Sequence, residues 1–203
     1  MILDFLFPKY CLECKKPGKY ICDLCISKVT PCGTCGKVGD NYSIFKYEGV
    51  IRKAIISLKY KFAYDLGDEL TSRVLRVIKT NPKFNDPKLV IVPIPLYKTR
   101  ENWRGFNQSG LIGEKLAKAM NWNYIPDLLI RNKNTAPQVG LKGSIRRSNL
   151  SNVFAVCSPY IQYTKYDILV FDDVYTTGST INEAKKVLKE ARFKKVYSLT
   201  IAR

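Results

Sequence analysis

The chain has 203 residues, 46% of them hydrophobic, which is enough to bury the core of one full-sized domain with a small appendage, or of two small domains. Its 34 Lys and Arg against 17 Asp and Glu give a formal net charge of +17, which favours an anionic partner such as nucleic acid or phosphorylated metabolites over a merely solvated surface. Histidine is absent, which excludes Ser–His and Cys–His nucleophile pairs and histidine metal ligands. Any chemistry must therefore use carboxylates, cationic side chains, backbone amides or a metal.

The sequence contains no apolar run that approaches the roughly 20 residues of a membrane span. Its start, "MILDFLFPKY", has a short apolar stretch interrupted by Asp4, and no basic region precedes it. We interpret this stretch as a packing segment and not as a signal peptide. The expectation is a cytoplasmic protein without membrane insertion.

Three CxxC pairs lie within the first 35 residues: Cys11 and Cys14, Cys22 and Cys25, Cys32 and Cys35. One CxxC turn presents two thiolates to a metal, and two such turns complete a tetrahedral zinc site. The Pro-Gly dipeptide at 17–18 suits a hairpin between the first two pairs. This spacing predicts a structural zinc ion, and the first choice of ligands is Cys11, Cys14, Cys22 and Cys25.

Other uses of these thiols stay open. Cys32 and Cys35 can replace either of the preceding pairs or hold part of a second metal site. Disulfides would need an oxidising compartment, and a redox CxxC would not need three pairs. Cys157 stands alone after an apolar stretch and is interpreted as a buried bystander.

After the cysteines, the pattern of apolar residues alternates between strand and helix. It predicts strands at 41–49, 88–95, 152–156, 167–171 and 196–202, and helices at 50–61, 65–80, 107–120 and 180–193. Such alternation is typical of an α/β fold with a parallel sheet. We place the boundary between a zinc-binding segment, 1–40, and the α/β segment, 41–203, near residue 40.

The stretch "DILVFDDVYTTGST" (167–180) carries the chemistry. The predicted strand ends at residue 171, and Asp172 and Asp173 are the first residues outside it. The hydroxyl-rich turn that follows, with one glycine at a helix N-terminus, is suited to a phosphate. A carboxylate pair beside it would accept hydrogen bonds from a diol, so the segment predicts a ribose 5-phosphate site. The alternatives are a plain polar turn, or a Walker-type nucleotide site, for which no GxxxxGK[ST] stretch exists.

The two acids followed by "TTGST" are similar to the phosphoribosyl-pyrophosphate (PRPP) loop of type I phosphoribosyltransferases. Over essentially its whole length the chain resembles the ComF family, which includes the late-competence ComF/ComFC proteins and the GntX proteins. The motifs that carry this resemblance are "VPIPL" (92–96), "RGFNQS" (104–109), "TAPQVGL" (135–141), "RRSNL" (146–150) and "VFAV" (153–156), and more weakly "LKYK" (58–61). It implies a type I phosphoribosyltransferase-like parallel sheet flanked by helices, behind a small N-terminal four-cysteine zinc-ribbon domain.

The resemblance also implies roles. Asp172 and Asp173 would contact the ribose hydroxyls, the loop would hold the 5′-phosphate, and Mg²⁺ would bridge pyrophosphate and ribose. Arg104 is the first choice for an anion contact, although Arg104 and Asn107 can instead fix the loop to the following helix; Arg146 and Arg147 are weaker candidates. The implied catalytic residues are Asp172, Asp173 and Arg104. The implied PRPP-binding residues are Asp172, Asp173, Val174, Tyr175, Thr176, Thr177, Gly178, Ser179, Thr180, Lys98 and Arg100.

Two functions follow from the resemblance and the charge. The first is an enzyme that transfers phosphoribosyl to an unidentified acceptor. The second is a DNA-handling protein of natural transformation that binds single-stranded DNA through basic and aromatic groups, with competence helicase or translocation proteins as candidate partners. The stretches "LKYKFAY" (58–64) and "YKTRENWRGF" (97–106) suit such contacts, although their aromatic residues can equally be packing residues. The two functions are compatible.

Overall fold

The computed structural model describes residues 8–32, 40–60, 64–132 and 153–203. Its centre is a sheet of five parallel strands in the order β1-β7-β6-β2-β3. The strands are β1 (Asn41–Phe45), β2 (Leu89–Pro93), β3 (Asn123–Tyr124), β6 (Asp167–Val174) and β7 (Val196–Ala202). Two further strands, β4 (Leu129–Arg131) and β5 (Phe154–Val156), form a small antiparallel sheet. The predicted fold class, a parallel α/β sheet flanked by helices behind a four-cysteine cluster, is confirmed.

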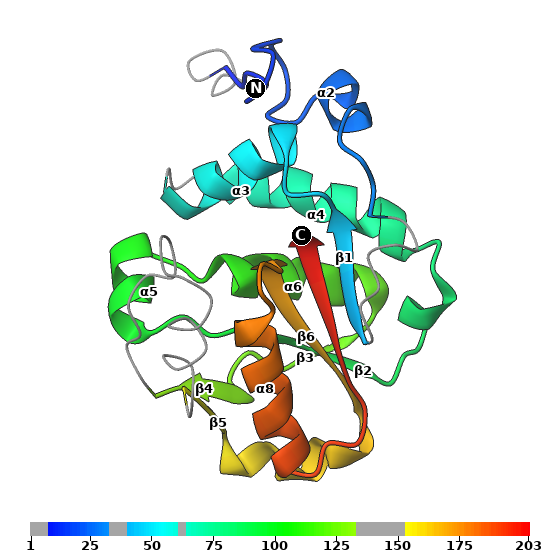
Figure 1. The fold of residues 1–203 in the computed structure, drawn as a ribbon, viewed down its shortest axis with the longest axis vertical. Helices are drawn as coiled ribbons and strands as arrows, with labels where there is room; N and C mark the ends of the chain where they lie inside the picture. Colours follow the sequence, from blue (N-terminus) through cyan, green and yellow to red (C-terminus); the bar gives the residue numbers. More distant parts are fainter. Residues whose placement is uncertain (1–7, 33–39, 61–63, 133–152) are drawn as a thin grey trace.

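Helices cover both faces of the sheet (Figure 1). The α-helices are α2 (Asp23–Ser27), α3 (Gly49–Tyr60), α4 (Tyr64–Ile78), α5 (Lys98–Arg104), α6 (Gln108–Met120) and α8 (Ser179–Glu190), and the 3₁₀ helices are η2 (Pro82–Phe84) and η3 (Ser158–Lys165). Figure 1 shows α8 in front of the sheet, α6 behind it, and α3 across the end at which the strand arrowheads lie. The carboxyl edge of the sheet is therefore bordered by α3.

Strand β6 explains why the sheet is buried on both faces. Ile168 and Val170 point into a core shared with α8, whereas Leu169 and Phe171 point into a core shared with α3, α4 and α6. All four side chains have no exposed surface. Because alternate residues of a strand face opposite sides, a strand covered twice must be apolar throughout, which is the pattern that the sequence shows.

Strand β6 is longer than predicted. It runs through Val174, and Asp172 and Val174 pair with β7 opposite Thr200 and Ala202. The expectation that Asp172 and Asp173 lie just outside the strand is therefore wrong, because the ladder to β7 continues to the pair Val174–Ala202. The backbone that carries both carboxylates is consequently fixed within the strand.

Other differences concern short elements. The predicted strand at 152–156 does form β5, but it pairs with β4 and not with the parallel sheet. Helix α5 lies in a segment for which no helix was predicted, and it ends at Gly105, whose φ is +77°. The left-handed conformation at Gly105 stops the helix after two turns and allows α6 to begin directly.

The N-terminal segment, residues 8–32, is called the cysteine module below. It packs directly against α3 and α4, and its Cys11, Ile21 and Cys22 belong to the same core cluster as Ile51 of α3. The Glu69 carboxylate of α4 accepts hydrogen bonds from the amides of the module's residues 20 and 21, at 3.0 and 2.8 Å. The module is thus attached by its backbone as well as by apolar contact.

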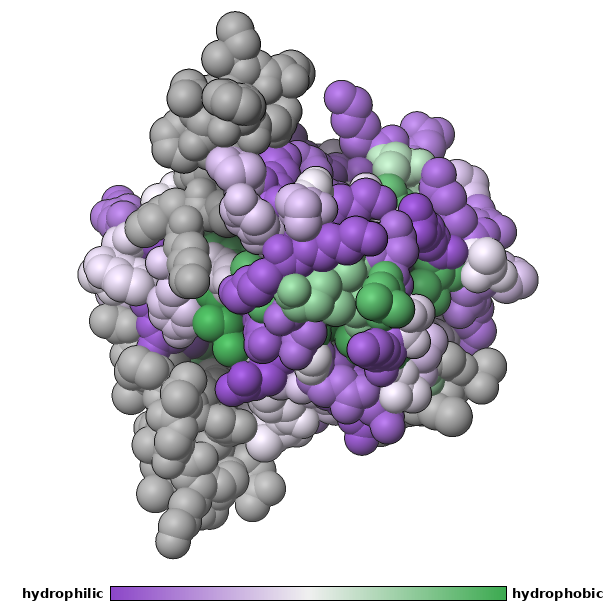
Figure 2. Space-filling view, turned by 90° about the horizontal axis from the view of Figure 1, so that it is seen from above, coloured by the Kyte–Doolittle hydropathy of each residue, from purple (hydrophilic) through white to green (hydrophobic). Residues whose placement is uncertain are grey.

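Figure 2 shows the molecule from the end that carries the cysteine module. Most of the described residues on this face are hydrophilic, and a small group of hydrophobic residues lies in its middle. No helix in the described part of the chain is long and apolar enough to cross a membrane.

Candidate functional site

The Sγ atoms of Cys11, Cys14, Cys22 and Cys25 lie within 4.8 Å of one another. The first pair lies on a turn in which Lys15, with φ of +64°, donates its amide to the carbonyl of Cys11 at 2.9 Å. The second pair opens α2, where Cys22 is the N-cap and accepts from the amide of Cys25 at 3.4 Å. The structure thus brings together the four thiols that spacing ranked first.

This arrangement fits a tetrahedral metal site. Zn–S bonds of about 2.3 Å at tetrahedral angles place two sulfur atoms about 3.8 Å apart, and Cys14 Sγ and Cys22 Sγ lie 3.7 Å apart. A disulfide would need a separation of about 2.05 Å. Four close thiols in this geometry could bind a structural metal such as zinc.

The protonation of the thiols agrees with a cation between them. Burial acts to raise the pKa of Cys11, but hydrogen bonds from the backbone around Cys14 and Cys22 outweigh it and lower this pKa to about 6. Burial raises the pKa of Cys25 to about 12, and its three thiol neighbours add to this effect. Without a cation, Cys11 therefore favours the thiolate and Cys25 the thiol, and a cation between the sulfur atoms would stabilise the thiolate form of both.

The other predicted thiols lie elsewhere. Cys32 is buried outside this cluster, with its amide 2.8 Å from the carbonyl of Ile44, and Cys157 is half-buried before η3. Cys35 lies outside the described residues, as do Arg146, Arg147 and the "TAPQVGL" and "RRSNL" stretches.

The second candidate site lies at the carboxyl end of β6. Asp173 is 4% exposed, and its Oδ2 lies 2.7 Å from Nζ of Lys59 and accepts from Nε2 of Gln108 at 3.2 Å. Asp172 is half-buried, and its Oδ1 accepts from Oγ of Ser109 and from the amide of Asp173, both at 2.9 Å. Among the described residues, the second oxygen of each carboxylate has no hydrogen-bond partner.

The start of α6 holds the groups that support the carboxylates. Asn107 is the N-cap: its Oδ1 accepts from the amide of Ser109 at 3.0 Å, and its Nδ2 donates to the carbonyl of Ile94 at 3.0 Å. This ties α6 to the end of β2, so Gln108 and Ser109 reach Asp173 and Asp172 from a fixed position. The alternative structural role weighed for Asn107 fits these contacts.

Arg104 supports the carboxylates indirectly, through a hydrogen bond to Gln108. It is 8% exposed, its Nη1 donates to Oε1 of Gln108, and its guanidinium lies 5.7 Å from the ring centre of Tyr60. Its Nε is buried and has no hydrogen-bond partner in the described part of the chain. Burial lowers the pKa of Arg104, and the nearby charge of Asp173 partly offsets this effect.

The two acids differ in what surrounds them. Burial and the neighbouring charge of Asp173 raise the pKa of Asp172 to about 7, although Lys59 and the two donors at its Oδ1 act in the opposite direction. Burial acts to lower the pKa of Lys59, but the charge and hydrogen bond of Asp173 outweigh it, and this pKa is raised above its usual value. Near neutral pH, Asp172 is therefore poised between its acid and its ionised form.

Further cations lie close to the acids. Burial lowers the pKa of Arg131, on β4; Arg100 lowers it further by charge repulsion, and Asp172 opposes both. Arg100 also lowers the pKa of Arg104. Arg100 is thus close enough to repel both Arg104 and Arg131 beside a carboxylate, which is an arrangement suited to an anion with several charges. Lys98 is exposed at the first turn of α5.

The loop that follows the acids leads into α8. Its N-cap is Gly178, with φ of +75° and no capping side chain, so a bound anion can take that role. Oγ1 of Thr177 accepts from the amide of Ser179, in the first turn, at 3.4 Å. Thr177 Oγ1 and Ser179 Oγ lie 2.8 Å apart. The ring of Tyr175 lies against Gly178, where a Cβ atom would overlap it, and the guanidinium of Arg203 lies 5.9 Å from the ring centre.

An aromatic pair lies beside the carboxylates. Tyr60, at the end of α3, and Trp103, in α5, pack edge to face with ring centres 6.1 Å apart. They are 51% and 65% exposed, so neither is a core residue. The segments at 58–64 and 97–106, which were considered for nucleic-acid contacts, therefore meet at this pair.

Sequence reasoning missed several residues of this site. Lys59 lies in a stretch that was noted for the resemblance and for nucleic-acid contacts, and Gln108 and Ser109 lie in the "RGFNQS" motif, which was noted for the resemblance. The pattern of polar and apolar residues around these positions shows only which face of a helix is polar. It therefore did not indicate that these side chains contact the two carboxylates. Arg131 follows an ordinary apolar stretch, and nothing in the sequence marks it.

Comparisons with known proteins agree with the resemblance. The chain is 28% identical to competence protein F of Haemophilus influenzae over 97% of this chain and 85% of that protein. It is 27% identical to DNA utilization protein YhgH of Escherichia coli strain K12 over 88% of this chain and 82% of that protein. It is 26% identical to competence protein ComFC of Bacillus subtilis over 96% of this chain and 84% of that protein. No protein-family model matches.

Proposed function

The chain belongs to the ComF family, and from this premise we propose that it binds PRPP together with Mg²⁺ at the carboxyl edge of its sheet and acts in DNA uptake. The observation that carries the proposal is the pair of carboxylates at the end of β6, directly before a glycine-capped helix. Ligands of open α/β sheets bind at this edge. The names of the relatives, which refer to competence and DNA utilization, support the role in DNA uptake.

The geometry of the acids supports a diol. Lys59 and Gln108 occupy one oxygen of Asp173, and Ser109 occupies one oxygen of Asp172, so each carboxylate keeps one oxygen without a partner among the described residues. Two neighbouring hydroxyls of a ribose need two such acceptors. The 5′-phosphate would then lie at the N-terminus of α8, within the loop of residues 174–180, and Thr176 to Thr180 would surround it.

The cations suggest a transferase. In a phosphoribosyl transfer, an acceptor attacks C1 of the ribose and the C1–O bond to pyrophosphate breaks, so the pyrophosphate leaves with that electron pair. Arg100 and Arg131 would stabilise the leaving pyrophosphate, with Lys98 at the rim, and Arg104 would hold Gln108 in place. Mg²⁺ would supply further positive charge to the pyrophosphate, bound mainly through ligand oxygens.

We propose further that zinc occupies the four-cysteine cluster and that residues 1–40 form a zinc-ribbon-like domain on a phosphoribosyltransferase-like domain, 41–203. A site closed by four thiolates keeps no position open for a substrate. Its role would therefore be structural, which includes holding the cysteine module against α4 through Glu69.

Titration calorimetry of PRPP with Mg²⁺ into the zinc-loaded protein tests the PRPP site. We expect saturable binding that is lost in Asp172→Asn/Asp173→Asn. Asp167→Asn, at the opposite end of β6, is the matched control and should bind normally. A well-folded wild type that does not bind PRPP would refute the proposal.

A second candidate function, single-stranded DNA binding, is favoured by the exposed Tyr60–Trp103 pair and the net charge of +17. Bases stack on exposed aromatic rings, and Lys and Arg contact the phosphates. Fluorescence anisotropy with a labelled oligonucleotide would measure it. Trp103→Ala should weaken binding about fivefold or more, since stacking contributes about 1–3 kcal/mol per base. Unchanged affinity in Trp103→Ala would exclude this surface.

A further inference from the structure

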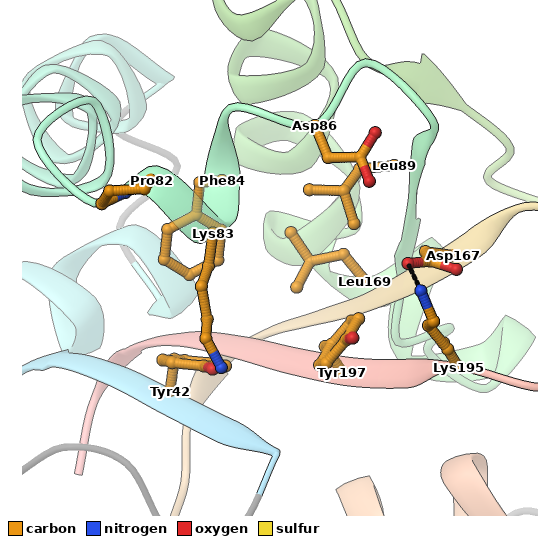
Figure 3. A pocket seen from close by; sticks show the side chains of 10 residues that line it. All are labelled: Tyr42, Pro82, Lys83, Phe84, Asp86, Leu89, Asp167, Leu169, Lys195 and Tyr197. Carbon is orange, nitrogen blue, oxygen red and sulfur yellow. Dashed lines mark hydrogen bonds and ion pairs between the residues drawn. The ribbon is translucent and has the colours of Figure 1, made fainter.

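A pocket of about 250 Å³ lies at the amino edge of the sheet, away from both sites described above (Figure 3). Its floor is one face of four strands: Tyr42 of β1, Tyr197 of β7, Leu169 of β6 and Leu89 of β2. These residues share a face, because Leu169 pairs with Tyr197 and lies two residues beyond Asp167, which pairs with Leu89.

The roof and rim come from the connection between α4 and β2. Phe84 of η2 packs edge to face on Tyr42, with ring centres 5.3 Å apart, so two aromatic rings meet at one side of the pocket. Lys83 Nζ lies 5.8 Å from the ring centre of Tyr42, and Lys195 Nζ lies 3.3 Å from Oδ2 of Asp167 at the other side. Figure 3 shows the Lys83 ammonium beside Tyr42 and the Lys195 ammonium beside Asp167, at opposite ends of the pocket lining.

One polar atom of the pocket lacks a partner. The hydroxyl of Tyr42 is buried and makes no hydrogen bond within the described residues. A buried hydroxyl without a partner is unfavourable, and such groups are normally satisfied by protein, water or a ligand. The pocket that Tyr42 lines is the space in which such a partner can lie.

We propose that this pocket binds a nucleobase, with the attached phosphate directed to Lys83 and Lys195. Aromatic and leucine side chains suit the flat faces of a base, and the Tyr42 hydroxyl and the Asp86 and Asp167 carboxylates suit its polar edge. A volume of about 250 Å³ accommodates one base with its sugar. The same chemistry is offered by a free nucleotide and by one base of a single strand.

This site is separate from the proposed PRPP site and does not depend on it. Asp167 and Asp172 are five residues apart on one strand, a distance of roughly 17 Å along β6. Asp172→Asn/Asp173→Asn should therefore leave nucleobase binding intact, and the pocket variants should leave PRPP binding intact. Failure of one proposal is thus distinguishable from failure of the other.

The test uses the full chain, with calorimetry to measure affinity. The probes are deoxyadenosine, its 5′-monophosphate, a short oligodeoxyadenylate and an abasic strand of equal length. Trp122 reports the location, because its Nε1 donates to the carbonyl of Phe84 at 3.1 Å. Its emission can be isolated in a Trp103→Phe background, since the chain has 2 tryptophans.

We expect the monophosphate to bind and to shift Trp122 emission. Tyr42→Phe, which keeps the ring, should weaken binding about fivefold, the effect of one lost hydrogen bond. Lys83→Ala/Lys195→Ala should weaken binding of the monophosphate but leave binding of the nucleoside unchanged. Lys118→Ala/Lys189→Ala removes equal charge from exposed positions and should change neither.

The arms also separate the two sources of the base. If the monophosphate binds as tightly as the oligodeoxyadenylate, the ligand is a free nucleotide. If the oligodeoxyadenylate binds much more tightly than the monophosphate, the ligand is a single strand. The proposal is overturned if the abasic strand binds as well as the oligodeoxyadenylate and no free probe binds. It is equally overturned if Tyr42→Phe and Lys83→Ala/Lys195→Ala bind every probe as the wild type does.

Discussion

Nζ of Lys59, at the end of α3, lies 2.7 Å from Oδ2 of Asp173, at the end of β6. The carboxylate side chain is 6% exposed and the lysine side chain 23% exposed, so the pair is largely removed from water. It joins the helix that packs on the cysteine module to the strand that ends at the candidate ligand site. Because the charge of Asp173 is balanced within the protein, the site can hold two adjacent acids without a bound cation.

Replacing Lys59 should therefore destabilise the fold. Lys59→Met keeps the length of the side chain but leaves Asp173 buried without its cation, which should lower the free energy of unfolding by about 3 kcal/mol. Denaturant unfolding monitored by circular dichroism would measure it.

Lys53→Met on the same helix is the matched control. Lys53 pairs with Glu13 at 3.2 Å, but the two side chains are 46% and 37% exposed. An exposed pair contributes only about 0–1 kcal/mol. Equal losses in the two variants would mean that the contact of Lys59 with Asp173 has no special role.

The long elements could be predicted from the sequence because their apolar residues have a clear period. Strand β6 and helix α4 are examples, since Leu66, Leu70, Val74 and Ile78 lie on one buried face of α4. The four cysteines could be predicted because two tight turns suffice to bring them together. In both cases the information lies within a few residues along the chain.

The contacts between distant segments could not be predicted in this way. The pairing of Lys59 with Asp173 and of Ser109 with Asp172 depends on how α3 and α6 meet the end of β6. The extension of β6 to Val174 depends on its ladder to β7. The elements α5 and β4 are too short to show a period, so neither was predicted, and Arg131 of β4 carried no signal.

Binding of PRPP should depend on pH through Asp172. Its pKa of about 7 means that the carboxylate that would accept ribose hydroxyls is partly protonated at neutral pH. Below pH 7 the affinity should fall, approaching tenfold per pH unit, and binding near neutral pH should release a proton. Calorimetry in two buffers of different ionisation enthalpy would show both effects, and an Asp172→Asn variant that kept the same pH dependence would assign it to another group.

The same shift makes a prediction for stability. The pKa of Asp172 is raised above its usual value of 3.8, so between about pH 4 and pH 7 the folded chain holds a proton that the unfolded chain has lost. This contribution to stability is complete below pH 4 and is lost as the pH rises through 7. Asp172→Asn should therefore gain stability relative to the wild type as the pH is raised from 5 to 8. A constant difference, measured by denaturant unfolding across this range, would contradict the prediction.

The choice among the cysteines can be tested by metal content. Cys14→Ser removes one thiol of the close cluster and should lower the affinity for zinc, and because a structural metal is linked to folding, thermal stability should fall as well. Cys32→Ser, outside the cluster, should retain zinc at the wild-type stoichiometry, as should Cys157→Ser. Atomic emission of dialysed protein gives the stoichiometry. A loss of zinc in Cys32→Ser that matched the loss in Cys14→Ser would assign Cys32 to the site.

Tyr175 should oppose binding of the ligand. Its ring lies against Gly178 within the loop proposed for the 5′-phosphate, so the ring must move before a phosphate can approach the start of α8. Tyr175→Val keeps the backbone bond from residue 175 to the carbonyl of Ala202, at 2.8 Å, and removes the ring. Affinity for PRPP should rise about threefold to tenfold, because the ring no longer has to be displaced. Tyr166→Val, before β6, is the control and should leave affinity unchanged. Weaker binding in Tyr175→Val would show instead that the ring contacts the bound ligand, and that the loop already has the conformation that the phosphate requires.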